Sequence, residues 1–494
     1  MSSIDEIRGL RIKKLALLRQ EGMNPYPADA KRELSLQEAI ENFDTLEKKK
    51  TVQWIAGRIL SIRGQGAIIF ITLNDGTASF QGLLKKDVIG DRKFNFWNEV
   101  VDIGDFVEVQ GTFFVTQRGE KTVAVKDWRM LSKSLRPLPE KWHGLEDEET
   151  KFRKRYLDIL TNPETKKIFV EKNIFWSSFR EFMVRKGFLE LEMPVLESTP
   201  GGAEAEPFKT HHNALDENFY LRISLELPLK KMLVAGCPKV FEIGRIFRNE
   251  GISATHLQDY TQLEFYSAYA DFGMLMDFIE EMYQYVIQKT FHTLKLKFRD
   301  EMMDWGGTWE RINYLELFQE NTEINLETAS DKELKKYLDK HKVKYEDFAE
   351  RGRLMDLIFK DIRKKGIKWQ GAKPIKPFFL INQPVELEPL AKRDEKNPKI
   401  VQRMQIIAYS MELGKGFGEL NDPLDQRIRF EAQMKLREAG DKEAQMLDED
   451  YVEAMEYGMP PAVGFGVSER LFSVLKNISV REGVIFPLMK PKGD

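Results

Sequence analysis

Apolar and polar positions change their spacing along the chain, and these changes divide it into regions. Residues 4–22 place apolar side chains near one stripe of a helix, which a proline-containing stretch after Gly22 ends. Between Thr51 and Ser132, five short apolar or alternating runs are separated by turn sequences. Such a run of short strands is typical of a small Greek-key barrel of the OB type, although an SH3-like barrel or a small sandwich fits nearly as well.

The region after the strands is proline-rich at first and then mixes helical with strand periodicity. The mixed order, without repeating βαβ units, predicts an α+β domain with an antiparallel sheet. Helices are predicted at 166–186 and 271–292, and strands at 219–227, 239–248 and 260–269. We therefore expect four regions: a helical extension (1–50), an OB-type barrel (51–134), a linker (135–155) and an α+β domain (156–494) with a charged, helical, peripheral insertion at 328–366.

Composition narrows the class of protein. The 494 residues are 42% hydrophobic and 31% charged, so sizeable cores with a charged surface are expected. No run reaches the ~20 apolar residues of a membrane span, and no signal-peptide core is evident, which favours a cytoplasmic protein without a membrane partner. Cys237 is the single cysteine, which excludes an internal disulfide or a cysteine zinc site. The net charge of −3 means that any polyanion must be held by local patches.

The most informative pattern is Phe247-Arg248-Asn249-Glu250-Gly251 followed, after a short loop, by the alternating run from Tyr260 to Tyr266. Two strands with such a loop form a hairpin, and period 2 puts Tyr260, Gln262, Glu264 and Tyr266 on one face. A face with arginine, carboxylates and tyrosines suits a binding floor better than a core. An exposed sheet face with ordinary ion pairs is the alternative interpretation.

This hairpin resembles motif 2 of the class II aminoacyl-tRNA synthetases. Gly187-Phe188 through Pro194 resembles motif 1, and Gly464 through Arg470 resembles motif 3. More narrowly, the whole chain resembles bacterial-type lysyl-tRNA synthetases. The strings that carry this resemblance, in family order, are Arg136-Pro-Leu-Pro, Arg155-Tyr-Leu-Asp, Pro200-Gly-Gly-Ala, His211-His-Asn-Ala-Leu-Asp, Ala268-Tyr-Ala-Asp, Gly418-Glu-Leu-Asn-Asp and Asp448-Glu-Asp-Tyr-Val. The resemblance implies ATP-dependent ligation of L-lysine to tRNA(Lys), a Mg²⁺ cofactor, and a homodimer formed through the motif 1 region.

The resemblance also implies roles for residues at the ATP site. Amino-acid activation relies on positioning and charge neutralisation, so arginines and Mg²⁺ matter more than a general base. Arg248 and Arg470 take the catalytic positions, and the implied ATP-binding residues are Arg248, Glu250, His256, Tyr260, Glu412 and Arg470. Glu412 and Glu419 match the Mg²⁺-binding pair. Their spacing is odd, so a bend near Gly414, Gly416 or Gly418 is needed to turn both to one face.

Lysine recognition requires a buried anion for the ε-ammonium and an aromatic wall along the alkyl stem. By resemblance, Glu419 and Tyr266 hold the ε-ammonium and Phe417 lines the stem, while Glu226, Glu264 and the backbone at Gly202 hold the α-amino group. We expect Glu226 to share a strand face with Arg222 and Ser224. In the barrel, the resemblance makes Phe70 and Gln81 anticodon-reading residues, with Arg58 and Glu120 as further contacts. The strand pattern alone favours a core position for Phe70.

Two departures from the family pattern affect the site. Motif 3 is one residue short before Glu469-Arg470, and Lys415 stands where an asparagine near the substrate carboxylate is usual. Lys415 either forms a salt bridge to that carboxylate or turns away to solvent. Other interpretations are a paralogue that lysylates elongation factor P, an enzyme for aspartate or asparagine, and a tRNA-binding protein with a decayed site. The complete barrel argues against the paralogue. The presence of Glu419 and Tyr266 argues against an enzyme for aspartate or asparagine, and the retained motif residues argue against a protein with a decayed site.

Overall fold

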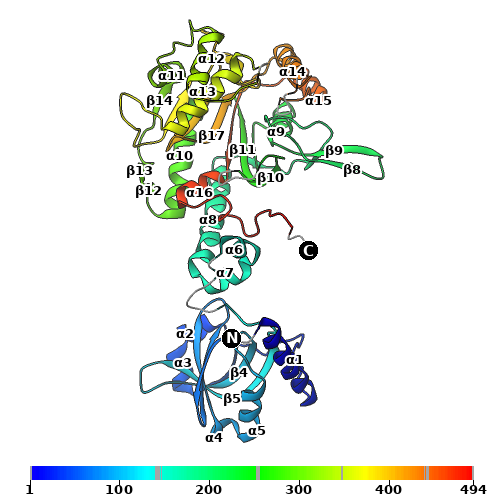
Figure 1. The fold of residues 1–494 in the computed structure, drawn as a ribbon, viewed down its shortest axis with the longest axis vertical. Coiled ribbons are helices and arrows are strands. Elements are labelled where there is room, and N and C mark those ends of the chain that lie inside the picture. Colours follow the sequence, from blue (N-terminus) through cyan, green and yellow to red (C-terminus); the bar gives the residue numbers. More distant parts are fainter. Residues whose placement is uncertain are drawn as a thin grey trace. The chain divides into compact units, whose positions relative to one another are not determined.

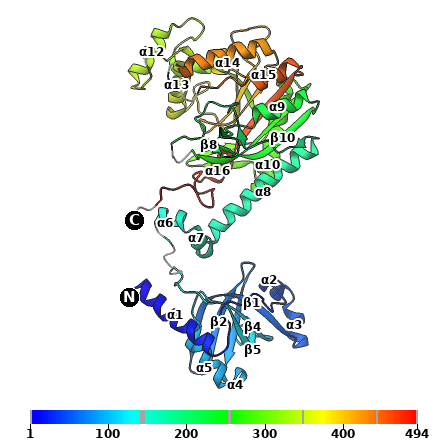
Figure 2. The ribbon, with the colours of Figure 1, turned by 90° about the vertical axis from the view of Figure 1, so that its right-hand side faces the viewer.

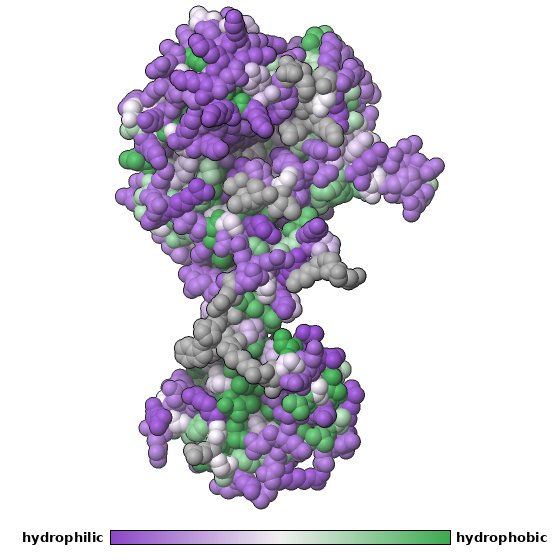
Figure 3. All heavy atoms as spheres, in the orientation of Figure 1, coloured by the Kyte–Doolittle hydropathy of each residue, from purple (hydrophilic) through white to green (hydrophobic). Residues whose placement is uncertain are grey.

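The computed structural model describes residues 3–139, 145, 147–251, 256–346, 349–438, 440 and 444–491. The chain forms two compact units, residues 1–146 (the barrel unit) and residues 147–494 (the sheet unit). Among the described residues, no helix is both long and apolar enough to cross a membrane. The faces seen in Figure 3 are mainly hydrophilic, in keeping with the 31% of charged side chains. Part of the predicted linker, residues 140–144 and 146, lies outside the described residues.

The barrel unit confirms the predicted barrel and excludes the sandwich. Its five strands close in the order β1-β2-β3-β5-β4, and alternate residues such as Ile59, Ile71 and Val109 fill the interior. The N-terminal helices share this core through Leu18 and Phe43, so the extension packs on the barrel. The elements are α1 (Ile4–Gln20), α2 (Leu36–Glu41), α3 (Phe43–Lys49), β1 (Val52–Gln65), β2 (Ile68–Asn74), β3 (Ser79–Lys85), α4 (Lys86–Ile89), α5 (Asp91–Val100), β4 (Phe106–Val115) and β5 (Lys121–Ser132).

The sheet unit is built on eight strands in the order β14-β15-β16-β17-β18-β11-β10-β6 (Figure 1). Neighbouring strands run antiparallel except at the two edges, where β14–β15 and β6–β10 are parallel, so the predicted antiparallel sheet is confirmed in its centre. The strands are β6 (Leu189–Glu190), β10 (Lys239–Phe247), β11 (Asp259–Ala268), β14 (Glu310–Asn313), β15 (Phe378–Ile381), β16 (Arg403–Ala408), β17 (Met411–Gly418) and β18 (Ala462–Ser468). Smaller sheets use β7 (Leu196–Glu197), β8 (Lys209–His212) and β9 (Glu217–Leu221), and β12 (Lys295–Phe298) with β13 (Glu301–Asp304).

Two long helices cover one face of the sheet (Figure 2), where Phe179 of α8 and Tyr283 of α10 pack against Phe265 and Phe465 in one core. Helices α12 and α13 of the predicted insertion share a second core with β14 and β15. The helices are α6 (Glu148–Arg153), α7 (Arg155–Thr161), α8 (Pro163–Arg185), α9 (Glu226–Val234), α10 (Phe272–Phe291), α11 (Tyr314–Thr322), α12 (Asp331–Lys340), α13 (Arg351–Lys365), the 3₁₀ turn η1 (Val385–Leu387), α14 (Pro423–Glu438), α15 (Glu449–Glu456) and α16 (Arg470–Lys476).

The predicted strand at 219–227 is wrong in its second half. Strand β9 ends at Leu221, and helix α9 begins at Glu226. The chain turns between them because the Arg222 guanidinium donates to the carbonyls of Met193 and Arg245 and pairs with Glu242. Pro228 fits the first turn of α9, where a backbone N–H has no helical partner. Glu226 therefore reaches the site from a helix, and does not share a strand face with Arg222 and Ser224.

Candidate active site

The middle of the large sheet forms a trough whose floor is the glycine-containing strand β18. Gly464 lies between Phe417 of β17 and Tyr266 of β11 in one row of paired residues. In the next row on the same face, Gly466 lies between Lys415 and Glu264. Strands are about 4.8 Å apart, so the two walls stand roughly 10 Å from each other with no side chain between them. In the shortened motif 3, Gly464 and Gly466 thus both face the cleft.

Two adjoining cavities of about 130 and 140 Å³ open over this trough and share Arg248, Tyr260, Ser468 and Arg470. The alternation predicted for β11 is confirmed, because Tyr260, Gln262, Glu264 and Tyr266 all line the first cavity, while Leu263 and Phe265 enter the core behind the sheet. The first cavity is also lined by six more of the predicted ATP and lysine residues: Gly202, Glu226, Arg248, Glu412, Phe417 and Arg470. The second cavity is lined by the predicted ATP residues Arg248, Glu250, His256, Tyr260 and Arg470.

One end of the trough is acidic and almost fully buried. Glu264 is 3% exposed and is held in place by Ser224 Oγ at 2.7 Å, the backbone N–H of Leu225 at 3.1 Å and the Tyr266 hydroxyl at 3.0 Å. Gly202 has φ +80° and lies so close to Ser224 and Glu226 that a Cβ there would be 2.8 Å from the Cβ of Glu226. Gly202, Glu226 and Glu264, which are predicted to bind the α-amino group of lysine, therefore lie close together.

Beneath this end lies an ion cluster that sequence reasoning missed. Lys230 of α9 is 0% exposed; its Nζ donates to Glu226 Oε1 at 2.6 Å and pairs with Glu419 Oε2. Burial raises the pKa of Glu419 to about 8 and that of Glu226 to about 6, and the Lys230 ammonium opposes both increases. The i, i+4 spacing between Glu226 and Lys230 is the signal that the sequence offers, but it has meaning only in a helix, and the pattern of 219–227 predicts a strand that includes Glu226.

Glu419 keeps one oxygen for a ligand. Its Oε1 is buried and has no hydrogen-bond partner among the described residues. That oxygen lies beside the trough floor, because a Cβ at Gly464 would be 2.3 Å from it and 2.3 Å from the ring of Tyr266. Phe417, which is 4% exposed, lines the opposite wall. A buried, unpaired carboxylate oxygen beside two aromatic rings is a suitable acceptor for an alkylammonium group.

The other end of the trough is cationic. Arg248 follows β10, its Nε donates to the carbonyl of Ile223 at 3.2 Å, and its guanidinium carbon is 5.7 Å from the centroid of the Tyr260 ring. Arg470 begins α16, and its buried Nε has no partner among the described residues. Burial and the charges of Arg470 and Arg248 lower the pKa of His256, while Glu250 opposes them. Arginine N–H groups gathered in this way suit a phosphate ligand.

Helix α16 is tied to α8 by a contact that the sequence did not indicate. Lys172 Nζ donates to Glu469 Oε2 at 2.5 Å and to the carbonyl of Gly483 at 2.8 Å. Glu469 is 2% exposed and precedes Arg470 directly. The pair therefore fixes the start of α16 and, with it, the position of the Arg470 side chain.

The predicted bend in β17 is present. Gln405 pairs with Lys415 and Ile407 with Glu412, so β17 has one extra residue at a β-bulge. The bulge contains Gly414, where a Cβ would be 2.6 Å from Phe465, and the Tyr283 hydroxyl donates to the carbonyl of Leu413 at 2.7 Å. Because of this bulge, both Glu412 and Lys415 line the cavity.

The two carboxylates predicted to bind Mg²⁺ have different partners. Glu412 Oε2 accepts from Gln405 Nε2 at 2.6 Å and lies 3.7 Å from Arg363 Nη1, whereas Glu419 pairs with Lys230. No group of three or more possible metal-ligating side chains was found in the described part of the chain. Glu412, a carboxylate at the cationic end, fits a Mg²⁺ ion that is bound chiefly by phosphate oxygens and water. Glu419 already pairs with Lys230, and the Mg²⁺-binding pair of Glu412 and Glu419 stays a prediction.

Lys415 remains close to the cavity instead of extending into solvent. Its Nζ is 3.6 Å from Glu388 Oε2 and 5.3 Å from the centroid of the Phe417 ring, and 39% of its side chain is exposed. Glu388 has a second cation, Arg403, at 3.8 Å. Glu388 would therefore keep a partner if Lys415 turned toward a ligand.

In the barrel unit, the predicted anticodon residues Arg58, Phe70 and Gln81 lie on the outer surface of neighbouring strands. Phe70 is only half-buried and lies outside the core, so the core position favoured by its pattern is wrong. The Gln81 amide is held by the Thr122 hydroxyl at 2.8 Å. The guanidinium of Arg58 lies 4.2 Å from the Phe106 ring centroid, and Glu120 is exposed in the turn before β5.

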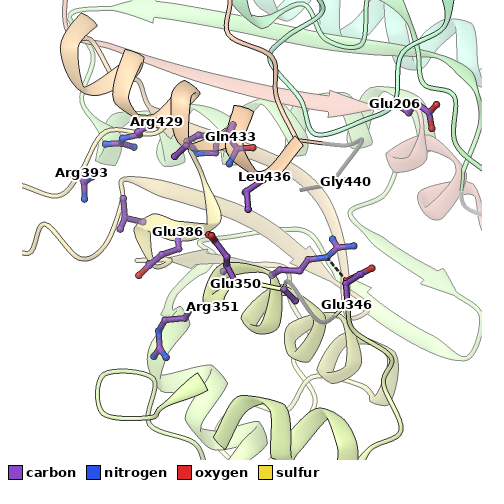
Figure 4. A pocket seen from close by; sticks show the side chains of 16 residues that line it. Glu206, Glu346, Glu350, Arg351, Glu386, Arg393, Arg429, Gln433, Leu436 and Gly440 are labelled. Carbon is purple, nitrogen blue, oxygen red and sulfur yellow. Dashed lines mark ion pairs between the residues drawn. The ribbon is translucent and has the colours of Figure 1, made fainter. Parts of the chain in front are cut away.

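A larger cavity, about 650 Å³, lies elsewhere in the sheet unit between α13, η1 and α14 (Figure 4). None of the residues that line it belongs to the predicted site. Its four arginines are already paired: Arg351 with Asp331 at 2.9 Å, Arg353 with Glu346 at 4.0 Å, and both Arg393 and Arg429 with Asp425, at 3.5 and 2.6 Å. Size alone therefore does not make this cavity the better candidate.

Comparison with known proteins agrees with this geometry. The family model "tRNA synthetases class II (D, K and N)" matches residues 147–490, and "OB-fold nucleic acid binding domain" matches residues 53–131. Similar curated proteins are the lysine–tRNA ligases of Pelotomaculum thermopropionicum (41% identity; 99% of this chain and 96% of the relative), Moorella thermoacetica (41%; 99% and 98%) and Thermotoga maritima (39%; 99% and 97%). The chain belongs to the class II tRNA synthetases and, within them, to the lysine–tRNA ligase family.

The close packing at Gly464 gives a direct test of the acidic end. In Gly464→Ala, the new Cβ would collide with Glu419 Oε1 and the Tyr266 ring, so one of them must move. We expect the dissociation constant for lysine to rise by at least about 30-fold, because displacement of a buried charged partner costs more than 2 kcal/mol, while ATP affinity stays within about twofold. Calorimetric titration with each ligand measures both. Gly9→Ala, in open space on α1, is the matched control. Equal losses for both ligands would contradict the assignment.

Proposed function

We propose that the chain is an ATP-dependent lysine–tRNA ligase, which activates L-lysine to lysyl-adenylate and transfers the lysyl group to the 3′ end of tRNA(Lys). The observation that carries this proposal is the charge of the buried end of the trough. Glu226 and Glu419 share one resident ammonium, Lys230, and Glu264 lies at the same end of the trough, so carboxyl groups outnumber ammonium groups there. Free lysine brings two ammonium groups, and Glu419 has an unpaired oxygen for one of them.

Within the same class, aspartate and asparagine are the competing substrates. An aspartate side chain needs a cation that is free to pair with it, whereas Lys230, the buried lysine at this end, already contacts two carboxylates. The complete barrel and the end-to-end match to lysine–tRNA ligases also argue against a paralogue that lacks the tRNA-reading domain.

Lysine then lies along the trough over the two glycines of β18. Its ε-ammonium contacts Glu419 and Tyr266, and its alkyl stem passes Phe417. The α-ammonium lies near Glu264, Glu226 and the backbone of Gly202. Since uncharged analogues would leave Glu419 buried without a partner, they are strongly rejected.

Activation is an in-line displacement at the α-phosphate of ATP by the lysine carboxylate, with pyrophosphate leaving. Arg248 bridges the carboxylate and the α-phosphate with its two-pronged guanidinium. Tyr260 stacks on adenine, Glu250 accepts from its amino group, and His256 contacts the phosphates. Arg470 covers the other adenine face and reaches the γ-phosphate. Catalysis therefore comes from orientation and charge neutralisation, without a general base.

Mg²⁺, when bound, neutralises charge on the triphosphate. Glu412 is the residue of this chain that would hold it. Gln405 and Arg363 keep the Glu412 carboxylate in place. Burial alone would raise the pKa of Glu412, but the positive charges of Arg363, Arg403, Lys415 and Arg470 outweigh burial and lower this pKa.

Since tRNA, ATP and lysine meet where translation takes place, the protein acts in the cytoplasm.

The amino-acid specificity of ATP–pyrophosphate exchange tests the function directly. With each of the twenty amino acids in turn, we expect exchange with lysine alone. In Glu419→Gln, KM for lysine should rise by at least about 100-fold, because a charged buried partner becomes a neutral amide. Exchange by the control Glu449→Gln, on an exposed pair with Arg427, should be unchanged. Unaltered lysine activation by Glu419→Gln would rule out its role in side-chain recognition.

The barrel surface supports anticodon reading by Phe70, Gln81, Arg58 and Glu120. In Phe70→Ala, we expect kcat/KM for tRNA(Lys) charging to fall about 10- to 100-fold, since stacking of one base contributes roughly 1–3 kcal/mol. Lysine-dependent pyrophosphate exchange without tRNA should not change. Val88→Ala, at a residue 47% exposed on α4, is the control. A loss of exchange in Phe70→Ala would mean that the variant is misfolded or that the two steps are not separate.

We also propose a homodimer through the motif 1 region. Exposed apolar side chains recur along this part of the chain, at the end of α8, in β6, and in and just before β7: Val184 (55% exposed), Leu189 (52%), Val195 (41%) and Leu196 (45%). Such a series is typical of a surface that another chain covers.

Light scattering coupled to gel filtration tests this surface. The wild-type chain should elute as a dimer, and Leu189→Asp as a monomer, because a carboxylate would be buried without a partner. Leu424→Asp, at a residue 69% exposed on α14, should remain dimeric. A monomeric wild type, or a dimeric Leu189→Asp variant, would refute the proposed interface.

A further inference from the structure

Lys230 has no role in the assignments above, yet it is fully buried and contacts two carboxylates of the site. It is one of the largest fully buried side chains of the protein. A lysine without solvent contact must lose its hydration, and only close anions offset that cost. Its neighbour Lys231 on the same helix is partly exposed and does not line the cavities of the site.

Groups from four elements face the Lys230 ammonium. Glu226 Oε1, on its own helix α9, accepts at 2.6 Å, and Glu419 Oε2, just after β17, pairs with it from the sheet. The ring centroid of Tyr266, on β11, is 5.7 Å from Nζ. Tyr451, on α15, is fully buried and interacts with the same charge. The ammonium thus takes one oxygen from each carboxylate and points its remaining surface at an aromatic face.

This arrangement determines which carboxylate oxygen of Glu419 is available to a ligand. With Oε2 held by Lys230, the second oxygen of Glu419 lies beside Gly464 and the Tyr266 ring. That is the side from which the cavity is reached, because Gly464 and Tyr266 line the cavity. Because the Lys230 ammonium already contacts both carboxylates, a ligand ammonium cannot take the same place between them.

We propose that Lys230 is a positioning residue for lysine recognition. It holds Glu226 and Glu419 by one oxygen each, turns Glu419 Oε1 toward the ε-ammonium of the substrate, and closes the bottom of the pocket at the length of a lysine side chain. The inference rests on the proposed function, since it concerns the same amino-acid site.

The alternative is that Lys230 only fastens α9 to the sheet. The two roles differ in which ligand is affected. A positioning role weakens lysine binding and leaves ATP binding intact, because Arg248, Tyr260 and Arg470 do not contact Lys230. A purely structural role lowers thermal stability and weakens both ligands together.

Lys230→Met, which keeps the approximate volume and removes the charge, is the principal variant, and Lys231→Met is the matched control. We expect KM for lysine in pyrophosphate exchange to rise at least about 100-fold in Lys230→Met, since two buried carboxylates lose their shared partner. KM for ATP should stay within about twofold. The control should behave as the wild type in both assays.

Lys230→Ala adds a second readout that does not depend on the first variant. It removes three carbons and the ammonium beyond Cβ, which are the atoms of n-propylammonium. In calorimetric titration of Lys230→Ala, we expect n-propylammonium at millimolar concentration to lower the dissociation constant for lysine at least about tenfold. We expect n-propanol to leave this constant unchanged. Rescue by both compounds would show that filling the space is sufficient, and would overturn the positioning role of the charge.

Three results separate the possible failures. If the wild type does not exchange with lysine, the proposed function itself fails. If the wild type exchanges with lysine and Lys230→Met has the same or a lower KM for lysine, the inference about Lys230 fails alone. If Lys230→Met loses lysine and ATP affinity equally and unfolds at a lower temperature, Lys230 is only a structural fastening.

Discussion

The site depends on a charged cluster that is buried at the acidic end of the trough. Burying one carboxylate or one ammonium alone is prohibitively costly, but Lys230 between Glu226 and Glu419 gives each charge a close partner. The cluster brings together a helix, the end of β17 and, through Tyr266, the strand β11. Because removal of any member leaves another charge unpaired, the geometry of the acidic end is fixed before a ligand arrives.

The glycines of β18 make that cluster accessible. An alanine at position 464 would occupy the space where Glu419 and Tyr266 approach each other, so the carboxylate can reach the trough only beneath a residue without a side chain. The bulge in β17 has the complementary effect at the other wall, where it turns both Glu412 and Lys415 toward the cavity. Backbone features thus decide which charges a substrate meets.

Local periodicity was sufficient to predict some of this arrangement. The alternation from Tyr260 to Tyr266 identified the side chains that line the cavity, because a strand turns every second residue to the same face. It failed at Glu226, where alternation continues past the end of a strand into a helix, and so Lys230 was not found. It failed also at Phe70, since an aromatic residue on an outer barrel face has the same pattern as one inside. The contacts of Lys172 with Glu469, and of Gln405 with Glu412, join side chains whose proximity only the folded sheet reveals.

The opposite charges at the two ends of the trough explain how one site could bind both the ammonium groups of lysine and the phosphates of ATP. A lysyl-adenylate carries its ε-ammonium at one end, its α-ammonium beside the carbonyl and a phosphate beyond it, and the proposed roles would match these groups with carboxylates at one end and with Arg248 and Arg470 at the other. A ligand bound in the reverse direction would place like charges together, which costs several kcal/mol. In the proposed binding mode, orientation would therefore come from the charge pattern, and the reacting carboxylate would lie where the acidic end gives way to the cationic end. Lys415 and Glu264, facing each other across Gly466, stand at that boundary.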